Sequence, residues 1–114
     1  MTPSDQRPEL AAAAAHAHRW LDSLAERGIP ATIDAASVLA AIPARLPAAA
    51  VAPTEVIDEL VRLVEPGLMA SQSGRFYGWV MGGTLPAALA ADWLVSAWDQ
   101  NAGMRDATPG VVGV

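Results

Sequence analysis

A long apolar stretch in the last third of the sequence constrains the fold more than any other feature. Residues 75–103 read RFYGWVMGGTLPAALAADWLVSAWDQNAG, and between Arg75 and Asp99 the only charged side chain is Asp92. The stretch holds three of the four tryptophans. A chain of 114 residues buries roughly two-thirds of its unfolded surface, so its own core cannot hide this much apolar material. We therefore expect the stretch to be covered by protein outside this sequence.

Composition narrows the possible functions. The sequence contains no lysine, so no side chain can form a Schiff base with pyridoxal phosphate or with a carbonyl substrate. It carries 12 acidic residues against seven arginines and has no basic run, which argues against binding to a nucleic-acid backbone. Because it also lacks cysteine and a leader-like N-terminal segment, we expect a cytoplasmic protein.

Helix-start and helix-stop residues predict a mainly α chain with about four helices and one short extended stretch. Apolar residues that recur every three or four positions predict a first helix over residues 4–27, with Pro8 in its first turn. Thr32 or Asp34 is expected to cap a short second helix that runs through Ile42.

The same signals continue through the second half of the chain. Thr54 is expected to cap a third helix, which ends at Pro66-Gly67. Residues 76–81 are aromatic and β-prone, which predicts an extended segment or a single short strand. Thr84 is expected to cap a fourth helix over residues 85–100, whose apolar side chains cover several faces, as in a helix buried on more than one side.

Few residues suggest chemistry when taken singly. His16 and His18 are two positions apart on a predicted helix, so they point to different faces and cannot share a metal ion. Asp92 fits either a general acid or base or a hydrogen-bonded structural carboxylate. Gly82-Gly83-Thr84 fits either a phosphate-binding turn or an ordinary glycine turn before a helix. The residues alone support a helical interaction segment with no catalytic residue and no metal site.

Residues 75–83, continued by 86–94 and 98–102, resemble the N-terminal part of the pyridoxal-phosphate-dependent group II amino-acid decarboxylases. That family includes the aromatic-amino-acid, histidine and glutamate decarboxylases. The preceding helices match the N-terminal helical region of the family in order and spacing. The resemblance therefore spans nearly the whole chain, with residues 75–109 carrying its specificity.

The resemblance implies a place for this chain in a larger enzyme. Members of the family are fold-type-I α/β enzymes that use pyridoxal 5'-phosphate and act on amino acids as homodimers. Their N-terminal helices lie across the partner subunit. By this resemblance, residues 1–70 form an N-terminal helical dimerisation segment, and residues 71–114 are the truncated start of the pyridoxal-phosphate enzyme region.

The resemblance also implies a substrate-binding segment. In the family the aromatic stretch after Arg-Phe lies at the mouth of the active site, and the matching positions here are Trp79, Val80, Met81 and Gly82. Relatives active on aromatic amino acids carry Tyr-Phe-Pro-Thr there, so this departure argues against an aromatic substrate. Thr108-Pro109 matches a small-residue-Pro pair that leads into the next helix of the family.

Several functional residues of the family have no counterpart in this sequence. They are the Schiff-base lysine, the aspartate that pairs with the pyridine nitrogen, the histidine stacked on the ring, and the phosphate loop. That loop also contains Gly-Gly-Thr but lies further along the family's sequence than Gly82-Gly83-Thr84. Residues 104–114 end on an apolar run without a polar cap, which suggests a truncated chain.

Two hypotheses follow. The first is the N-terminal part of a pyridoxal-phosphate-dependent amino-acid decarboxylase, inactive alone, that supplies dimer contacts and part of the substrate pocket. The alternative is a stand-alone helical protein-interaction module without catalysis. Insertion of residues 77–98 into a membrane comes third: their length is near the roughly 20 residues required, but Gly82, Gly83, Pro86 and Asp92 interrupt them.

Overall fold

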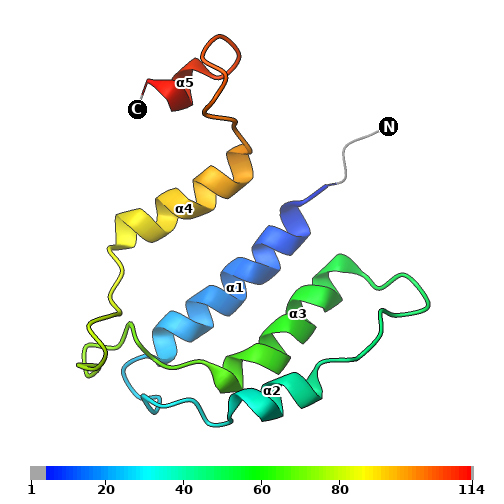
Figure 1. Cartoon of the computed structure of the whole chain (residues 1–114), viewed down its shortest axis with the longest axis vertical. Helices are drawn as coiled ribbons and strands as arrows, with labels where there is room; N and C mark the ends of the chain where they lie inside the picture. The colour runs from blue at the N-terminus through cyan, green and yellow to red at the C-terminus, as the bar shows by residue number, and fades with distance from the viewer. Residues whose placement is uncertain (1–4, 114) are drawn as a thin grey trace. The chain divides into compact units, whose positions relative to one another are not determined.

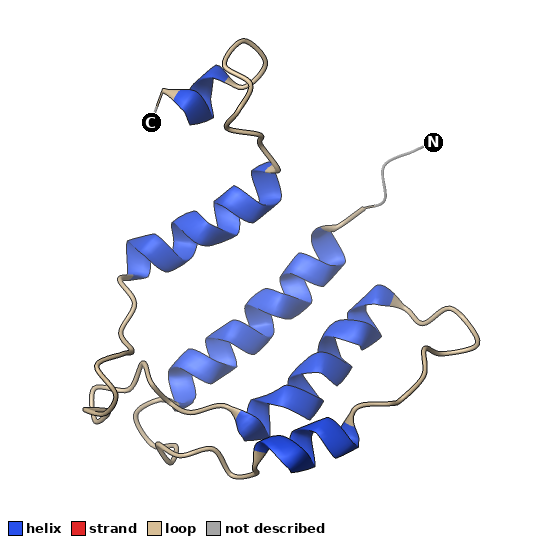
Figure 2. Ribbon diagram, viewed as in Figure 1, coloured by secondary structure: helices blue, strands red, loops and turns tan. Residues whose placement is uncertain are grey.

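The computed structural model describes residues 5–113 of the chain, and within that range it is helical and contains no strand (Figure 2). The elements, labelled in Figure 1, are α1 (Arg7–Ser23), α2 (Ala35–Ala41), α3 (Pro53–Val64), the 3-10 turn η1 (Glu65–Gly67), α4 (Pro86–Trp98) and α5 (Pro109–Val112). The prediction of a mainly α segment with three helices in its first 65 residues is confirmed.

The chain divides into two compact units, Met1–Gly82 and Gly83–Val114, which we call unit 1 and unit 2. Unit 1 contains α1, α2, α3 and η1, and unit 2 contains α4 and α5. The division into residues 1–70 and 71–114 that the family resemblance implies stays a prediction.

Helix α1 begins with Pro8 in its first turn, as predicted, because a proline there sacrifices no helical hydrogen bond. It ends at Ser23 rather than Arg27, because the next residues tighten into a turn: the amides of Leu24 and Glu26 donate three residues back, to the carbonyls of Leu21 at 3.2 Å and Ser23 at 3.1 Å. The predicted start at Ser4 lies outside the described residues.

Helices α2 and α3 differ in how they start. Asp34 caps α2 as predicted, since its Oδ1 accepts a 2.8 Å hydrogen bond from the amide of Ser37. The prediction that Thr54 caps α3 was wrong. Ala52 occupies the N-cap position and Pro53 is the first helical residue, because the ring of a proline already holds the φ angle that a first turn needs.

Unit 1 is built on the contact between α1 and α3, which lie side by side, with α2 against α3 (Figure 1). The facing side chains are mostly half-buried, and among residues 5–113 only Ala70 and Ser73 are fully buried. Backbone hydrogen bonds tie the connections to this helix pair: Thr32 donates to the carbonyl of Pro66 at 2.8 Å, and Ala70 donates to that of Ile29 at 2.9 Å. The core of unit 1 is therefore thin.

The predicted extended segment or strand over residues 76–81 was wrong. Trp79 and Val80 both adopt left-handed backbone angles, with φ of 61° and 51°, and form a turn. A β-prone segment becomes a strand only when a neighbouring strand satisfies its backbone groups. The described part of the chain offers no such neighbour, so the segment turns back instead.

In unit 2, α4 covers most of the predicted range 85–100 but begins and ends inside it. Thr84 does not occupy the predicted cap position: Leu85 is the N-cap, its side chain makes no cap hydrogen bond, and Pro86 is the first helical residue. Asp99 ends the helix in a left-handed conformation with φ of 48°. A short helix, α5, then starts at Pro109, as the Thr108-Pro109 pair predicts.

Candidate functional site

Residues 73–75 of unit 1 are hydrogen-bonded to backbone carbonyls at and just after the C-terminal end of α1. The guanidinium of Arg75 donates through Nη2 to the carbonyl of Arg27 at 2.6 Å and to that of Leu24 at 3.3 Å. The hydroxyl of Ser73 donates to the same Leu24 carbonyl at 3.1 Å. Carbonyls at the end of a helix have no partner within the helix, and a cation near them also matches the helix dipole. Residues 73–75 therefore fix the start of the loop that comes next.

Residues 76–81, here called the aromatic loop, carry three of the four substrate-binding positions implied by the resemblance. Trp79, Val80 and Met81 are exposed, as is Tyr77, and Val80 is fully so. Left-handed angles at two consecutive non-glycine residues, one of them β-branched, cost about 1–3 kcal/mol each. The loop thus presents a strained tip whose side chains stay available for contacts with another molecule.

Gly82, the fourth implied substrate-binding position, differs from the other three. Its φ is +96°, and a Cβ atom built on it would overlap the carbonyl oxygen of Ser71 and lie 3.2 Å from the ring of Phe76. Glycine is needed here both for the backbone angle and for the close approach. The structure therefore places Gly82 where the loop rests on the rest of unit 1, and gives it no side chain with which to select a substrate.

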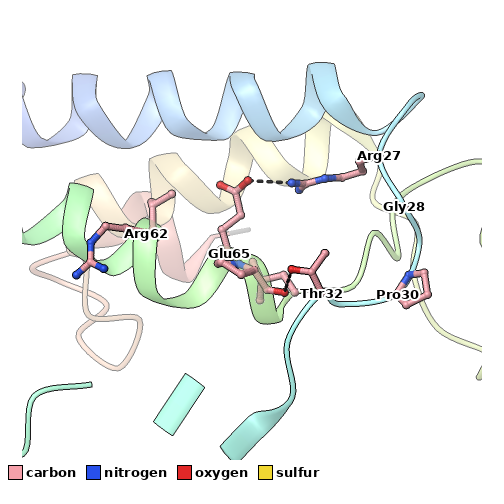
Figure 3. Close-up of a pocket in the computed structure, with 9 residues that line it drawn as sticks. Arg27, Gly28, Pro30, Thr32, Arg62 and Glu65 are labelled. Atoms are coloured by element: carbon pink, nitrogen blue, oxygen red, sulfur yellow. Dashed lines mark hydrogen bonds and ion pairs between the residues drawn. The ribbon is translucent and has the colours of Figure 1, made fainter. Parts of the chain in front are cut away.

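A second feature of unit 1, which the sequence did not predict, joins α1 to the end of α3. Nη2 of Arg27 lies 2.9 Å from Oε1 of Glu65, and the guanidinium carbon lies 3.8 Å from the centre of the Trp20 ring. Figure 3 shows the Arg27 and Glu65 side chains pointing toward each other, with Thr32 approaching the turn of η1. Complementary charges at two helix ends were the only signal in the sequence.

A pocket of about 420 Å³ lies beside this ion pair (Figure 3). Its polar walls are Arg27, Arg62, Glu65 and Thr32, and the hydroxyl of Thr32 is already bonded to the carbonyl of Pro66 at 3.0 Å. Because Arg27 is paired with Glu65 and Arg62 with Glu59, each arginine of the pocket already has a carboxylate partner and is not free for an anionic ligand.

The two histidines do not come together. His16 lies between α1 and α3, where its Nε2 contacts the carboxylate of Asp58 and its Nδ1 contacts the guanidinium of Arg19. This makes His16 part of a polar contact between the two helices. Residues 5–113 hold no group of three or more potential metal ligands.

Two further features that the sequence left open are Asp92, on α4, and the turn Gly82-Gly83-Thr84, which precedes α4 along the chain. Asp92 is exposed, and it makes no ion pair or hydrogen bond with any other described residue, so neither a buried acid nor a bonded structural carboxylate is formed here. Gly82-Gly83-Thr84 precedes α4 without forming its first turn, which starts at Pro86 and so lacks one amide. An anion bound there would not meet the first amides of α4 directly.

Helix α4 is apolar on several faces, and its side chains are largely exposed. Every residue of α4 apart from the half-buried Leu89 is exposed, including Trp93, Leu94, Val95 and Trp98. A helix of this composition is normally buried on more than one side. No helix within residues 5–113 has both the length and the apolar character needed to cross a bilayer.

Comparison with protein-family profiles, with curated proteins and with solved structures finds no match to this chain.

Proposed function

We propose that this chain is the N-terminal part of a pyridoxal-phosphate-dependent group II amino-acid decarboxylase of fold type I, inactive alone, which supplies dimer contacts and part of the substrate pocket. The intact enzyme would be a cytoplasmic homodimer that acts on an amino acid. The observation that carries the proposal is the exposure of α4 together with the aromatic loop that precedes it, because both are built to be covered by other protein or to touch a ligand.

Helix α4 supports the proposal through the free energy that its exposed side chains would gain on burial. Trp98 is 59% exposed, which for a side chain of about 250 Å² leaves roughly 150 Å² in water. At about 25 cal/mol per Å², covering Trp98 alone is worth about 4 kcal/mol. Trp93, Leu94 and Val95 add to this term. An interaction surface of this strength fits a segment that belongs inside a larger enzyme.

The aromatic loop supports the pocket role. Its tip is held in a strained conformation while the side chains of Trp79, Val80 and Met81 remain uncovered. Strained backbone is concentrated at ligand-binding sites, where the rest of the fold maintains it. The tip also lacks the hydroxyl of the Tyr-Phe-Pro-Thr pattern, so we expect a non-aromatic amino acid as the substrate.

The cofactor itself cannot be held covalently by this chain, because the sequence has no lysine. When bound in the intact enzyme, pyridoxal phosphate withdraws electrons from the α-carbon as the carboxylate leaves as carbon dioxide. The residues described here would shape the pocket and exclude water, and the groups that bind the cofactor would come from protein outside this sequence.

The coding sequence downstream of Val114 tests the proposal directly. We expect an open reading frame that contains a histidine-lysine pair a few hundred residues further on. A genuine stop codon directly after Val114 would overturn the proposal. As a second check, the isolated chain with its α-amino group acetylated is mixed with pyridoxal phosphate. Any covalent adduct, seen as a new absorbance band, would contradict the claim that the chain is inactive alone.

The pocket role has its own test in the intact enzyme. Replacing Trp79 by alanine removes the largest side chain at the loop tip, so the ratio of kcat/KM between amino acids of different size should change. Trp79→Phe, which keeps an aromatic ring at the same position, serves as the matched control. Unaltered kinetics across several amino acids for Trp79→Ala would count against the pocket role.

A stand-alone helical interaction module is the second candidate function, and the same exposure of α4 favours it. It differs from the first in needing no further domain and no cofactor. A stop codon after Val114 together with a stable complex between this chain and an unrelated protein would support it.

A further inference from the structure

The aromatic loop is strained at its tip and held at both of its ends. Consecutive left-handed angles at Trp79 and Val80 persist only where the surrounding structure fixes the chain on either side. The tip side chains are exposed, so they do not provide this restraint themselves. The restraint must come from the residues that flank the loop.

Arg75 forms the first anchor. Its Nη2 bridges the carbonyls of Leu24 and Arg27 at 3.3 Å and 2.6 Å, which ties the start of the loop to the C-terminal end of α1. Leu24 is the C-cap of α1, where a carbonyl needs an outside partner and a positive charge is favourable, and Arg27 lies in the connection that follows. Removing the guanidinium takes this donor away from the Arg27 carbonyl, while the Leu24 carbonyl keeps its hydrogen bond from the Ser73 hydroxyl.

Gly82 forms the second anchor. Its Cα faces the carbonyl oxygen of Ser71 so closely that a Cβ atom would overlap it. The next glycine, Gly83, also has a positive φ, of +80°, but a Cβ atom there would meet nothing within 4 Å. The two glycines therefore share the backbone angle and differ in the close approach, which makes them a matched pair.

We infer that Arg75 and Gly82 are positioning residues, which fix the aromatic loop on unit 1 and thereby decide which substrate side chain its tip admits. The anchoring depends only on the contacts above. The effect on substrate choice rests on the proposed function. In this inference Gly82 does not itself bind the substrate but holds the substrate-binding loop in place.

Proteolysis of the full 114-residue chain tests the anchoring. Thermolysin cuts before apolar residues, so the bond between Trp79 and Val80 reports on the loop. The bond between Ala50 and Val51, in the connection between α2 and α3, is the internal reference. Cleavage at each bond is followed by mass spectrometry, and the helical content by circular dichroism.

The variants come in matched pairs. Relative to the reference bond, Gly82→Ala and Arg75→Ala should speed cleavage of the loop by about tenfold, because cleavage tracks the population of the opened loop. Gly83→Ala, and Ala in place of the exposed Arg62, should change the same ratio less than about threefold. Arg75→Lys keeps a charged donor and should restore most of the protection.

The possible results separate clearly. Unchanged ratios in both Arg75→Ala and Gly82→Ala would overturn the inference, as would equal effects of Gly82→Ala and Gly83→Ala. A wild-type chain cut as fast in the loop as at the reference bond would overturn it too. If Gly82→Ala unfolds the whole chain, so that both bonds are cut faster, the comparison of Arg75→Ala with Arg75→Lys decides.

Kinetics of the intact enzyme test the consequence for substrate choice. Gly82→Ala should raise KM for the amino acid at least about fivefold while kcat and the absorbance of the bound cofactor change little, as expected when uniform substrate binding is lost. Gly83→Ala should leave KM unchanged. If the variants lose loop protection but their kinetics do not change, the inference about anchoring stands and the pocket role is refuted. The failure of the proposed function can therefore be told from the failure of the anchoring.

Discussion

The contact of Arg27 with Glu65 and Trp20 gives the sharpest prediction about the stability of unit 1. Replacing Arg27 by alanine removes an ion pair in which the two side chains are 26% and 35% exposed, and it removes a guanidinium stacked on an indole ring. A partly exposed ion pair is worth about 0.5–1 kcal/mol, and the stacked cation about 1 kcal/mol. Nη1 of Arg27 is buried without a partner, which offsets part of this gain.

We therefore expect Arg27→Ala to lower the free energy of unfolding by about 1.5 kcal/mol. With a urea m-value of about 1.5 kcal/mol per molar, the midpoint should fall by about 1 M. The assay is urea unfolding of the full chain followed by circular dichroism at the helix band. Arg27→Lys keeps the charge but loses the planar stack on Trp20, so its urea midpoint should lie between those of the wild type and Arg27→Ala.

A double-mutant cycle of Arg27→Ala with Glu65→Ala isolates the ion pair. We expect a coupling energy of about 0.5–1 kcal/mol. The matched control is the pair of Arg62 with Glu59, three residues apart on α3 at 3.4 Å, whose side chains are 69% and 47% exposed. Its coupling should stay below about 0.5 kcal/mol. The reasoning fails if the coupling of Arg27 to Glu65 is no larger than that of the control pair.

Three further predictions concern local structure. Val80→Gly should leave the urea midpoint unchanged or raise it, because the side chain of Val80 is exposed and glycine adopts the left-handed angle without strain. A clear drop in the midpoint would show that the Val80 side chain makes stabilising contacts. Gly67→Ala should lower the melting temperature, since its Cβ would lie 2.6 Å from a methyl group of Val38, whereas Gly28→Ala, with open space around it, should be neutral or stabilising by about 0.5 kcal/mol. Hydrogen bonds from the side chain and the amide of Ser37 lower the pKa of Asp34, so the ionised cap stabilises α2 at pH values above the usual carboxyl pKa, and this stabilisation is lost as the pH falls through the lowered pKa. In an acid titration followed by circular dichroism, Asp34→Asn should lose part of this pH dependence while it keeps the cap. Asp34→Ala should lose both the pH dependence and the cap.

Local signals in the sequence predicted the helices well. Pro8 and Asp34 act within three residues of where they stand, so the chain around them is enough to fix their role. The prediction that Thr54 caps α3 was wrong because Pro53, immediately before it, also favours a helix start and takes the first helical position. The prediction of an extended segment or strand over residues 76–81 was wrong because β-propensity describes how side chains fit a sheet, and the described residues form no sheet.

The candidate site was only partly predictable. The resemblance pointed to residues 79–82 as one group, but the backbone separates an exposed tip from the anchor at Gly82, and residue types alone do not reveal a φ angle. The stacked ion pair joins Arg27 to a residue 38 positions away, which no helical periodicity encodes. Contacts of that range depend on how α1 and α3 pair, so they appear only in three dimensions.

The close approach of Gly82 to the Ser71 carbonyl also limits how the gene can change at this codon. Every missense mutation of a glycine codon adds at least a Cβ atom, and at residue 82 that atom has no room. At residue 83 the space is open, so aspartate, which tolerates left-handed angles better than most residues and needs only one base change from GGT or GGC, is an accessible replacement. Two adjacent glycines that look equivalent in the sequence should therefore accept very different mutations over evolutionary time.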